Sequence, residues 1–179
     1  MWQDALAAHR EGRARVVEVR ASDYVGRQAQ SMPGARAIPS LLAGKSVQVL
    51  GRIDQPHSWA YTRDVAATLV AAAAKEAAHG QAWMVPSDPA RTQRQAIDDM
   101  ADVARLARVN VLLVPTPILK ALMLVNPTIR ELKETLHQFR EPFVVDDTAT
   151  RSQLGVEPTP WREVLAATLE SYRSPVSNS

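Results

Sequence analysis

One stretch decides the fold: residues 16–26, which read VVEVRASDYVG. The valines at its start are typical of a buried β-strand, because β-branched side chains pack well on a pleated surface. The polar residues that follow lack this pattern, and Pro33 with Gly34 marks a turn further on. The stretch therefore predicts a strand over residues 15–20 that leads into a loop over residues 21–34.

Around this strand, the chain alternates between strands and helices. Short apolar runs between turn signals predict further strands at 46–50, 59–61, 82–85, 109–114 and 143–145. Segments with helical spacing predict helices at 2–12, 38–43, 63–79, 92–108, 117–126, 128–139 and 159–173. This alternation is the signature of an α/β protein.

Local capping signals mark several helix starts. Thr62 is expected to cap the helix at 63–79. Thr92 and Gln95 have the spacing of a capping box, in which each side chain bonds to the other residue's backbone N–H. Asp147 is expected to cap a small helix that ends at a glycine. These signals predict where the helices begin independently of the tertiary fold.

The composition is that of a globular protein, with 46% hydrophobic and 22% charged residues. The net charge is only +2 and the arginines are scattered, so a nucleic-acid partner is not expected. Without cysteine, the chain has no disulfide and no thiolate site. The most apolar stretches, 65–74 and 109–125, are too short or too interrupted to cross a membrane. A cytoplasmic protein is expected.

The sequence contains none of the catalytic motifs that we sought. No three glycines lie within six residues, so neither a dinucleotide fingerprint nor a P-loop is present. No tyrosine has a lysine four residues later, and no serine lies in a Gly-x-Ser-x-Gly elbow. The four histidines are far apart in sequence, which argues against a metal site. We therefore predict no catalytic residue and no metal in this chain.

Four segments, in order, resemble the extended short-chain dehydrogenase/reductase family, also called the NAD-dependent epimerase/dehydratase family. Residues 16–26 resemble the family strand that ends in an Arg-Pro-x-Asn-x-Tyr-Gly-Pro pattern, although Ala21 replaces the proline and Asp23 the asparagine. The other three are 47–66, which ends in a Tyr-x-x-Asp-Val-Ala helix start, 82–87, and 145–158 with its Leu-Gly pair. The resemblance covers nearly the whole chain.

The resemblance implies an α/β fold made of a partial Rossmann-like sheet remnant and the smaller α/β substrate-binding C-terminal domain. Residues 1–30 would be the last helix, strand and nicotinamide-side loop of the nucleotide-binding domain. Residues 31–173 would form the substrate-binding region, and 174–179 a disordered tail. The family's glycine-rich fingerprint and Tyr-x-x-x-Lys pair would lie upstream of Met1.

The resemblance also implies site residues and ligands. The loop after the first strand would lie beside the nicotinamide ring of NAD or NADP, mainly through the backbone. The cofactor-side residues would be Arg20, Ala21, Ser22 and Asp23. The substrate, a small molecule and possibly a nucleotide sugar in this family, would meet Arg52, Trp59, Tyr61 and Arg130.

Each of these residues also has a structural alternative. Asp23 could hold its loop by a local hydrogen bond to the backbone, and Asp64 could serve a helix N-terminus. For Arg52, a surface ion pair and a ligand contact both stay open. Arg130 could pair with Glu134 one helical turn away. The remaining alternatives are a core role for Trp59, Trp83 and Trp161, and an exposed turn for His57.

Together these observations predict the substrate-side half of an NAD(P)-dependent epimerase, dehydratase or reductase, inactive alone. The alternative is a non-catalytic ligand-binding or assembly module derived from the same family. A sheet cut at residues 16–19 would leave an unpaired edge, so self-association is expected. A third hypothesis, nucleic-acid binding by the arginines, lacks a basic tract.

Overall fold

The computed structural model describes residues 1–27, 29, 31–115 and 136–173. Its longer helices are α1 (Trp2–Arg10), α2 (Ile38–Leu42), α3 (Thr62–Ala74), α4 (Gln93–Ala104) and α7 (Trp161–Arg173). The strands are β1 (Glu18–Arg20), β2 (Asp23–Val25), β3 (Val47–Val49), β4 (Trp59–Tyr61), β5 (Ala82–Met84) and β6 (Val111–Leu113). Short 3-10 or π-helical turns are η1 (Met32–Arg36), η2 (Glu76–Ala78), η3 (Leu136–Phe139) and η4 (Thr150–Leu154).

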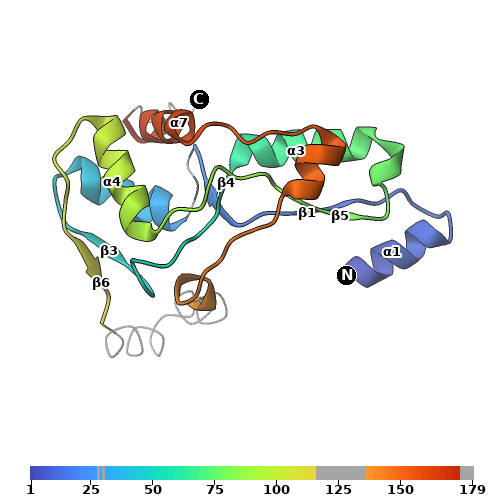
Figure 1. Cartoon of the computed structure of the whole chain (residues 1–179), viewed down its shortest axis with the longest axis horizontal. Coiled ribbons are helices and arrows are strands. Elements are labelled where there is room, and N and C mark those ends of the chain that lie inside the picture. The colour runs from blue at the N-terminus through green and yellow to red at the C-terminus, as the bar shows by residue number, and fades with distance from the viewer. Residues whose placement is uncertain (28, 30, 116–135, 174–179) are drawn as a thin grey trace, which may run out of the picture.

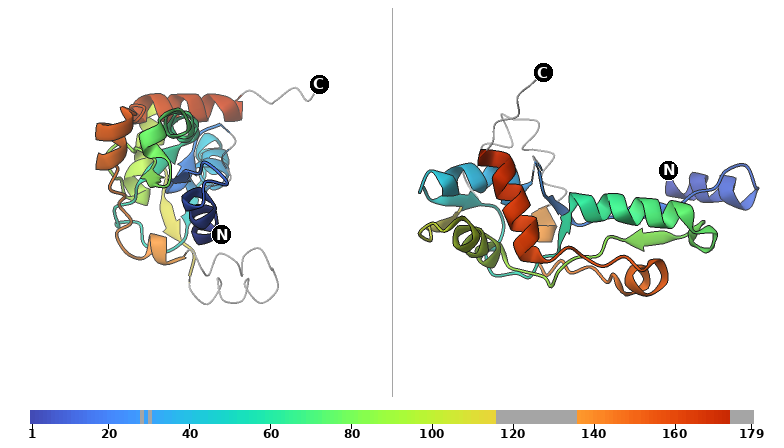
Figure 2. Two further views of the ribbon diagram at one scale, coloured as in Figure 1. Left: turned by 90° about the vertical axis from the view of Figure 1, so that its right-hand side faces the viewer. Right: turned by 90° about the horizontal axis from the view of Figure 1, so that it is seen from above.

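The strands form three parallel pairs: β1 with β5, β2 with β4, and β3 with β6. Figure 1 shows an elongated arrangement in which α4, α7 and the β3–β6 pair lie at one end and α1 at the other, with α3 and the β1–β5 pair between them. The view from above in Figure 2 agrees with this order. Parallel strands joined through helices confirm the predicted α/β class.

Two apolar cores hold these elements. The main core joins α2, α4 and α7 to the β2–β4 and β3–β6 pairs, with Ile38, Ile97, Met100 and Leu165 fully buried. The small core lies beside β1–β5 and consists of Ala72, Ala78 and Trp83, with Val17, Val19 and Leu154 packed against it. The small core buries far less apolar surface, so the α1–β1–β5 end gains less from the hydrophobic effect.

Strand β2 lies inside the segment 21–34 that the sequence predicts as a loop. Its three residues pair with β4 in the register Asp23↔Trp59 to Val25↔Tyr61. Val25 is fully buried whereas Tyr24 is half exposed. A strand this short, formed through a partner far along the chain, leaves too little local periodicity to be predicted.

The start of α3 corrects one predicted cap. Thr62 is the first residue of the helix rather than its cap, because the extended residue at the boundary is Tyr61, and no side chain caps α3. The helix also ends at Ala74 instead of His79, since Lys75 is extended. The His79 ring bonds to the carbonyl oxygen of Ala73 at 3.0 Å, which satisfies one of the carbonyl groups left free at the helix end.

The start of α4 confirms the predicted capping box. The backbone N–H of Gln95 donates to Thr92 Oγ1 at 3.1 Å, and the N–H of Thr92 donates to Gln95 Oε1 at 2.9 Å. The helix ends at Ala104, earlier than predicted, because Arg105 takes the left-handed conformation with φ 57°. Residues 117–126, most of 128–139 and the tail 174–179, for which helices and disorder are predicted, lie outside the described residues.

Candidate functional site

The candidate site lies where β1 and β5 end side by side. Their register places Arg20 opposite Met84, and the backbone N–H of Val85 donates to the carbonyl oxygen of Arg20 at 2.8 Å. Both strands therefore end at the same carboxyl edge of the pair, and the backbone continues toward Ser22 from β1 and toward Ser87 from β5. In open α/β sheets, ligands bind outside the carboxyl ends of the strands.

Ser22 and Ser87 bring buried hydroxyl groups to this edge. They are 6% and 7% exposed, and within the described part of the chain neither Oγ has a hydrogen-bond partner. The backbone of Ser87 is fixed, because its N–H donates to Asp147 Oδ2 at 2.8 Å and its carbonyl oxygen accepts from Arg151 at 2.9 Å. Two buried hydroxyl groups without partners are costly unless water or a ligand satisfies them.

Asp147 corrects a second predicted cap. Its carboxylate binds the Ser87 backbone and both Nε and an Nη of Arg151, at 2.8 to 3.0 Å, instead of capping the turn that follows it. The neighbouring Asp146 accepts from the Thr148 N–H at 3.0 Å, and among the described residues no side chain caps η4 itself. Burial raises the pKa of Asp147, but the hydrogen bonds from Arg151 and Ser87 outweigh it, so this pKa lies below its ordinary value. The charged Asp147–Arg151 pair thus anchors the loop that carries Ser87.

Asp23 and His57 face each other beside the same edge. Asp23 Oδ2 lies 3.4 Å from His57 Nε2, and the described residues give neither atom a hydrogen-bond partner. The prediction that His57 lies exposed in a turn is wrong, because its side chain is only 2% exposed. Within the described residues, Asp23 Oδ2 does not make the local loop hydrogen bond offered as its structural alternative. His57 is buried because its ring stacks on Trp59 and Phe139, with centroids 4.3 and 5.2 Å away.

Burial shifts the pKa values of this pair in opposite directions. It lowers the pKa of His57 to about 4, although a hydrogen bond to the Ser58 carbonyl opposes part of the shift. It raises the pKa of Asp23. Both shifts have one cause, because removal from water disfavours a charged imidazole and a charged carboxylate alike. The pair therefore favours a state without net charge on either ring or carboxyl group.

The other predicted site residues lie in different surroundings. Arg20, which is predicted on the cofactor side, binds Glu18 through Nε and Nη2 at 3.0 and 2.6 Å. Arg52 and Asp54 form a two-pronged pair in an exposed loop, at 2.9 and 2.8 Å. Trp59 and Tyr61 belong to the main core and are 4% and 6% exposed. Arg130 lies outside the described residues. The structure thus brings Ser22 and Asp23 together with Trp59 and leaves Arg52 apart.

All three tryptophans with a predicted core alternative are buried. Trp83 donates from its indole N–H to the Ala78 carbonyl at 3.0 Å, and Trp161 donates to Asp99 Oδ2 at 2.9 Å. Trp59 donates to the Arg91 carbonyl at 3.3 Å. Each indole buries its apolar ring and satisfies its one polar atom, as buried tryptophans usually do.

Two residues of the candidate site are not among the predicted site residues, namely His57 and Ser87. Ser87 follows a predicted strand, as Ser22 does. Because ligands bind outside the carboxyl ends of parallel strands, this position could have pointed to Ser87 as a site residue. His57 alternates with Trp59 and Tyr61, and residues two apart on an extended chain share a face. The aromatic spacing was therefore the available signal that His57 is buried with them.

Asp64 links the starts of α3 and α7. It is 6% exposed, and its carboxylate accepts from the Thr159 N–H at 2.9 Å and from Thr159 Oγ1 at 2.6 Å. Its place in the first turn of α3 also suits the positive end of the helix dipole. Asp64 thus has a structural role, but its hydrogen bonds go to Thr159, ahead of α7, and not to the N-terminus of its own helix.

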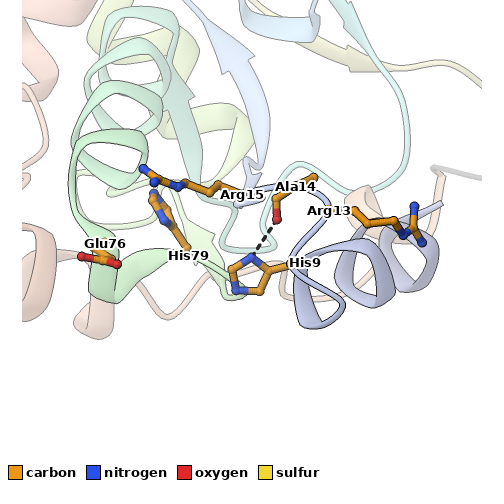
Figure 3. Close-up of a pocket in the computed structure, with 7 residues that line it drawn as sticks. His9, Arg13, Ala14, Arg15, Glu76 and His79 are labelled. Carbon is orange, nitrogen blue, oxygen red and sulfur yellow. Dashed lines mark hydrogen bonds between the residues drawn. The ribbon is translucent and has the colours of Figure 1, made fainter.

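Two surface pockets occur away from the carboxyl edge. One, of about 560 Å³, lies at the opposite, amino edge of β1 and β5 and is lined by His9, Arg13, Arg15, Glu76 and His79 (Figure 3). The other, of about 550 Å³, lies between residues 41–46 and 106–110. Neither of these two pockets is lined by a residue that the sequence singled out.

Metal-ligand clusters and membrane-spanning helices are both absent from the described ranges. Residues 1–27, 29, 31–115 and 136–173 contain no group of three or more His, Asp or Glu side chains placed to hold a metal ion. No helix within those same ranges has the length and apolar character needed to cross a membrane.

The fold resembles solved enzymes that act on nucleotide sugars or bind nicotinamide cofactors. UDP-glucuronic acid 4-epimerase from Bacillus cereus, in complex with UDP-glucuronic acid and NAD, matches with a TM-score of 0.71 at 15% identity over 96% of this chain and 49% of its own. UDP-glucose 4-epimerase from Thermotoga maritima, with UDP-glucose, matches with 0.71 at 16% identity over 96% of this chain and 50% of its own. RMD from Pseudomonas aeruginosa, complexed with NADPH, matches with 0.70 at 16% identity over 97% and 53%.

The chain spans about half the length of these structures. At such low identity the likeness establishes the fold alone, an α/β fold like the Rossmann-like fold of these enzymes. No family model and no curated protein matches the sequence.

Proposed function

We propose that this chain is the substrate-side half of an NAD(P)-dependent epimerase, dehydratase or reductase that acts on a nucleotide sugar or a similar small molecule, and that it is inactive alone. One observation carries the proposal: nearly the whole chain matches about half of enzymes solved with UDP-sugars and nicotinamide cofactors. The buried, unpartnered hydroxyl groups of Ser22 and Ser87 at the carboxyl edge support it, because they offer a ligand polar contacts.

The residues at the edge fit the nicotinamide end of NAD or NADP and not the rest of the cofactor. Among the described residues Ser22 Oγ is buried without a hydrogen-bond partner, so it can bond to a carboxamide, and residues 21–23 follow the end of β1. A glycine-rich turn for the pyrophosphate is missing from the sequence. The cofactor would supply hydride transfer, while this chain would position the ring and exclude water beside it.

On the substrate side, the proposal keeps Arg52, Trp59, Tyr61 and Arg130. An arginine can bind a diphosphate through two parallel hydrogen bonds. Arg52 already binds the carboxylate of Asp54 in this way. A ligand phosphate would have to displace Asp54. The domain boundaries at residues 30 and 173, and a cytoplasmic location, belong to the same proposal.

The first test is of turnover. With NAD added, the purified 179-residue chain is expected to convert none of UDP-glucose, UDP-glucuronic acid and dTDP-glucose, because it has no pyrophosphate cradle and no Tyr-x-x-x-Lys pair. Chromatography of the nucleotide sugars over time measures this, with a full-length UDP-glucose 4-epimerase as positive control, since an epimerase returns its hydride to the sugar and leaves no net NADH. Sustained turnover by the chain would contradict the proposal.

Titration of tryptophan fluorescence separates the leading proposal from the alternative, a non-catalytic ligand-binding or assembly module. Trp59 lies opposite Asp23 in the β2–β4 register, so a ligand at this edge is expected to change its emission. Saturable binding of UDP-glucose without turnover favours a binding module. An unchanged spectrum with both UDP-glucose and NAD favours a half-enzyme that needs its other half.

The second test is of self-association. Among the described strands, β1 pairs only with β5, and α3 exposes Leu69 and Val70 at 47% and 70%. An open strand edge and exposed apolar side chains favour association. Size-exclusion chromatography is therefore expected to give an apparent mass above 19.6 kDa that falls on dilution. A monomer at all concentrations that melts cooperatively would count against the half-enzyme proposal.

A further inference from the structure

The contact between Asp23 and His57 has a chemical consequence that follows from one hydrogen bond. His57 Nδ1 lies 2.6 Å from the carbonyl oxygen of Ser58. A carbonyl oxygen only accepts, so Nδ1 carries the hydrogen. In a neutral imidazole, Nε2 then has no hydrogen and faces Asp23 Oδ2 at 3.4 Å as a bare acceptor.

Two bare acceptors cannot share this buried space at low cost. If Asp23 is ionised and His57 neutral, the lone pairs of Oδ2 and Nε2 face each other, and both atoms lack a donor within the described residues. Each buried polar atom without a partner costs free energy, and an unpaired buried charge costs more. One proton on either atom removes the repulsion and supplies the missing donor.

We propose that Asp23 and His57 share a single proton and form a buried acid–base pair at the carboxyl edge of β1 and β5. The proposal concerns a property of this chain alone and holds whether or not the chain is half of an epimerase. The Asp23 side chain is 29% exposed and that of His57 only 2%, so the proton exchanges with solvent, or with a group bound at the edge, through Asp23.

The surroundings decide where the proton sits. Burial lowers the pKa of His57 and raises that of Asp23, and both shifts favour a protonated carboxyl group that donates to neutral Nε2. The faces of Trp59, Phe139 and Phe143 lie within 4.3 to 5.2 Å of the imidazole, and aromatic faces attract a cation. A charged imidazolium is thereby the second form of the same pair.

Other charged groups near the pair are occupied or exposed. The backbones of Arg91 and His57 form an isolated β-bridge. The guanidinium group of Arg91, however, binds Asp88 and Asp99 and lies 5.0 Å from the centre of the Trp161 ring. Four further charged residues lie in the same loop or beside Phe139. Arg52 and Asp54 form an ion pair with each other, and Arg140 and Glu141 are exposed. Within the described ranges, none of them forms an ion pair with Asp23 or His57.

A shared proton gives the folding equilibrium a definite pH dependence. Unfolded, Asp23 and His57 together hold about one proton between pH ~4 and ~6.5 and almost none above that range. The proposal requires the folded pair to hold its proton beyond the pH at which unfolded His57 loses its own, because burial and the proposed hydrogen bond both favour the protonated form. The folded pair then binds more protons than the unfolded chain does, and stability is lost as the pH rises above about 6.5, by up to tenfold in the folding equilibrium constant per pH unit.

The variant Asp23→Asn provides the matched control. Its side-chain amide donates an N–H to Nε2 without any titratable proton. His57 then stays neutral when folded and takes a proton when unfolded, so stability is lost as the pH falls from about 6.5 toward about 4 and stays constant above about 6.5. Wild type and variant are expected to slope in opposite directions.

Urea unfolding of both proteins across pH 4.5–8.5, in steps of roughly half a unit, measures these slopes. The difference between the two curves isolates the pair, because every other group is common to both. A folding constant that falls for wild type and stays level for D23N above about pH 6.5 supports the proposal. Parallel curves would overturn it.

A second measurement on the wild-type chain does not depend on how the variant folds. The Asp23 carboxyl carbon and the His57 ring nitrogens can be followed by NMR as the pH rises. A shared proton predicts that one of these sites titrates with a midpoint above about 6.5. Titration of Asp23 near about 3.9, with no step at either residue above about 6.5, would show that no proton is shared.

Discussion

Replacing Asp64 with alanine is expected to lower the free energy of unfolding by about 3 kcal/mol. The substitution removes a charged acceptor of two hydrogen bonds and leaves the two donors of Thr159 without a partner. Asp64 is buried in α3, and its two partners, the N–H and hydroxyl groups of Thr159, precede α7. The contact thus ties the two helix starts across the fold. Urea unfolding measures the change.

Two further variants show whether the bonds or merely the charge matter. Asp64→Asn keeps one acceptor oxygen, so it is expected to lose about half as much stability as Asp64→Ala. Asp146→Ala removes an exposed carboxylate that, within the described part of the chain, has the Thr148 N–H as its one partner, and its effect is expected to be much smaller. An Asp64→Ala protein as stable as Asp146→Ala would show that the Thr159 contact contributes nothing.

The second large effect is expected at Gly51. Its φ is +77°, and an added Cβ would overlap the carbonyl oxygen of Phe139 and lie 2.6 Å from the Phe139 Cβ. The same carbonyl accepts from the Arg52 N–H at 2.7 Å, so the two segments are held backbone to backbone. Gly51→Ala is expected to cost about 3 kcal/mol, from backbone strain and the forced separation together.

Gly44 offers a matched control for this substitution. Its φ is +64°, and a Cβ there would meet no atom within 4 Å. Gly44→Ala therefore carries the backbone strain alone, about 1 kcal/mol. The difference between the two variants in urea unfolding measures the clash with Phe139. Equal losses would mean that residues 136–139 yield without cost.

The features predicted correctly from sequence are those that neighbouring residues decide. The capping box of α4 involves only Thr92 and Gln95, and the structure has it as predicted. Caps that depend on distant groups were predicted wrongly. Asp147 turns to the Ser87 backbone, sixty residues earlier in the chain, and to Arg151 instead of its own turn.

The candidate site was predictable in part for the same reason. Ser22 and Asp23 follow a recognisable strand, so the edge could be located from the sequence. His57 was predicted as exposed because its turn looks polar, whereas rings from Trp59, Phe139 and Phe143 enclose it. Two of those rings come from more than eighty residues further along the chain, and no local pattern records such a contact.

The parallel pairing of the strands has a consequence for how the chain acquires its fold. Glu18, Asp23 and Val47 find their partners at Ala82, Trp59 and Val111. Long loops must close before these ladders form, and such topologies fold slowly. During synthesis from the N-terminus, β1 leaves the ribosome well before β5 exists, and β3 well before β6. Until then their apolar residues stay open to aggregation, and a chaperone that shields residues 16–49 would raise the yield of native protein.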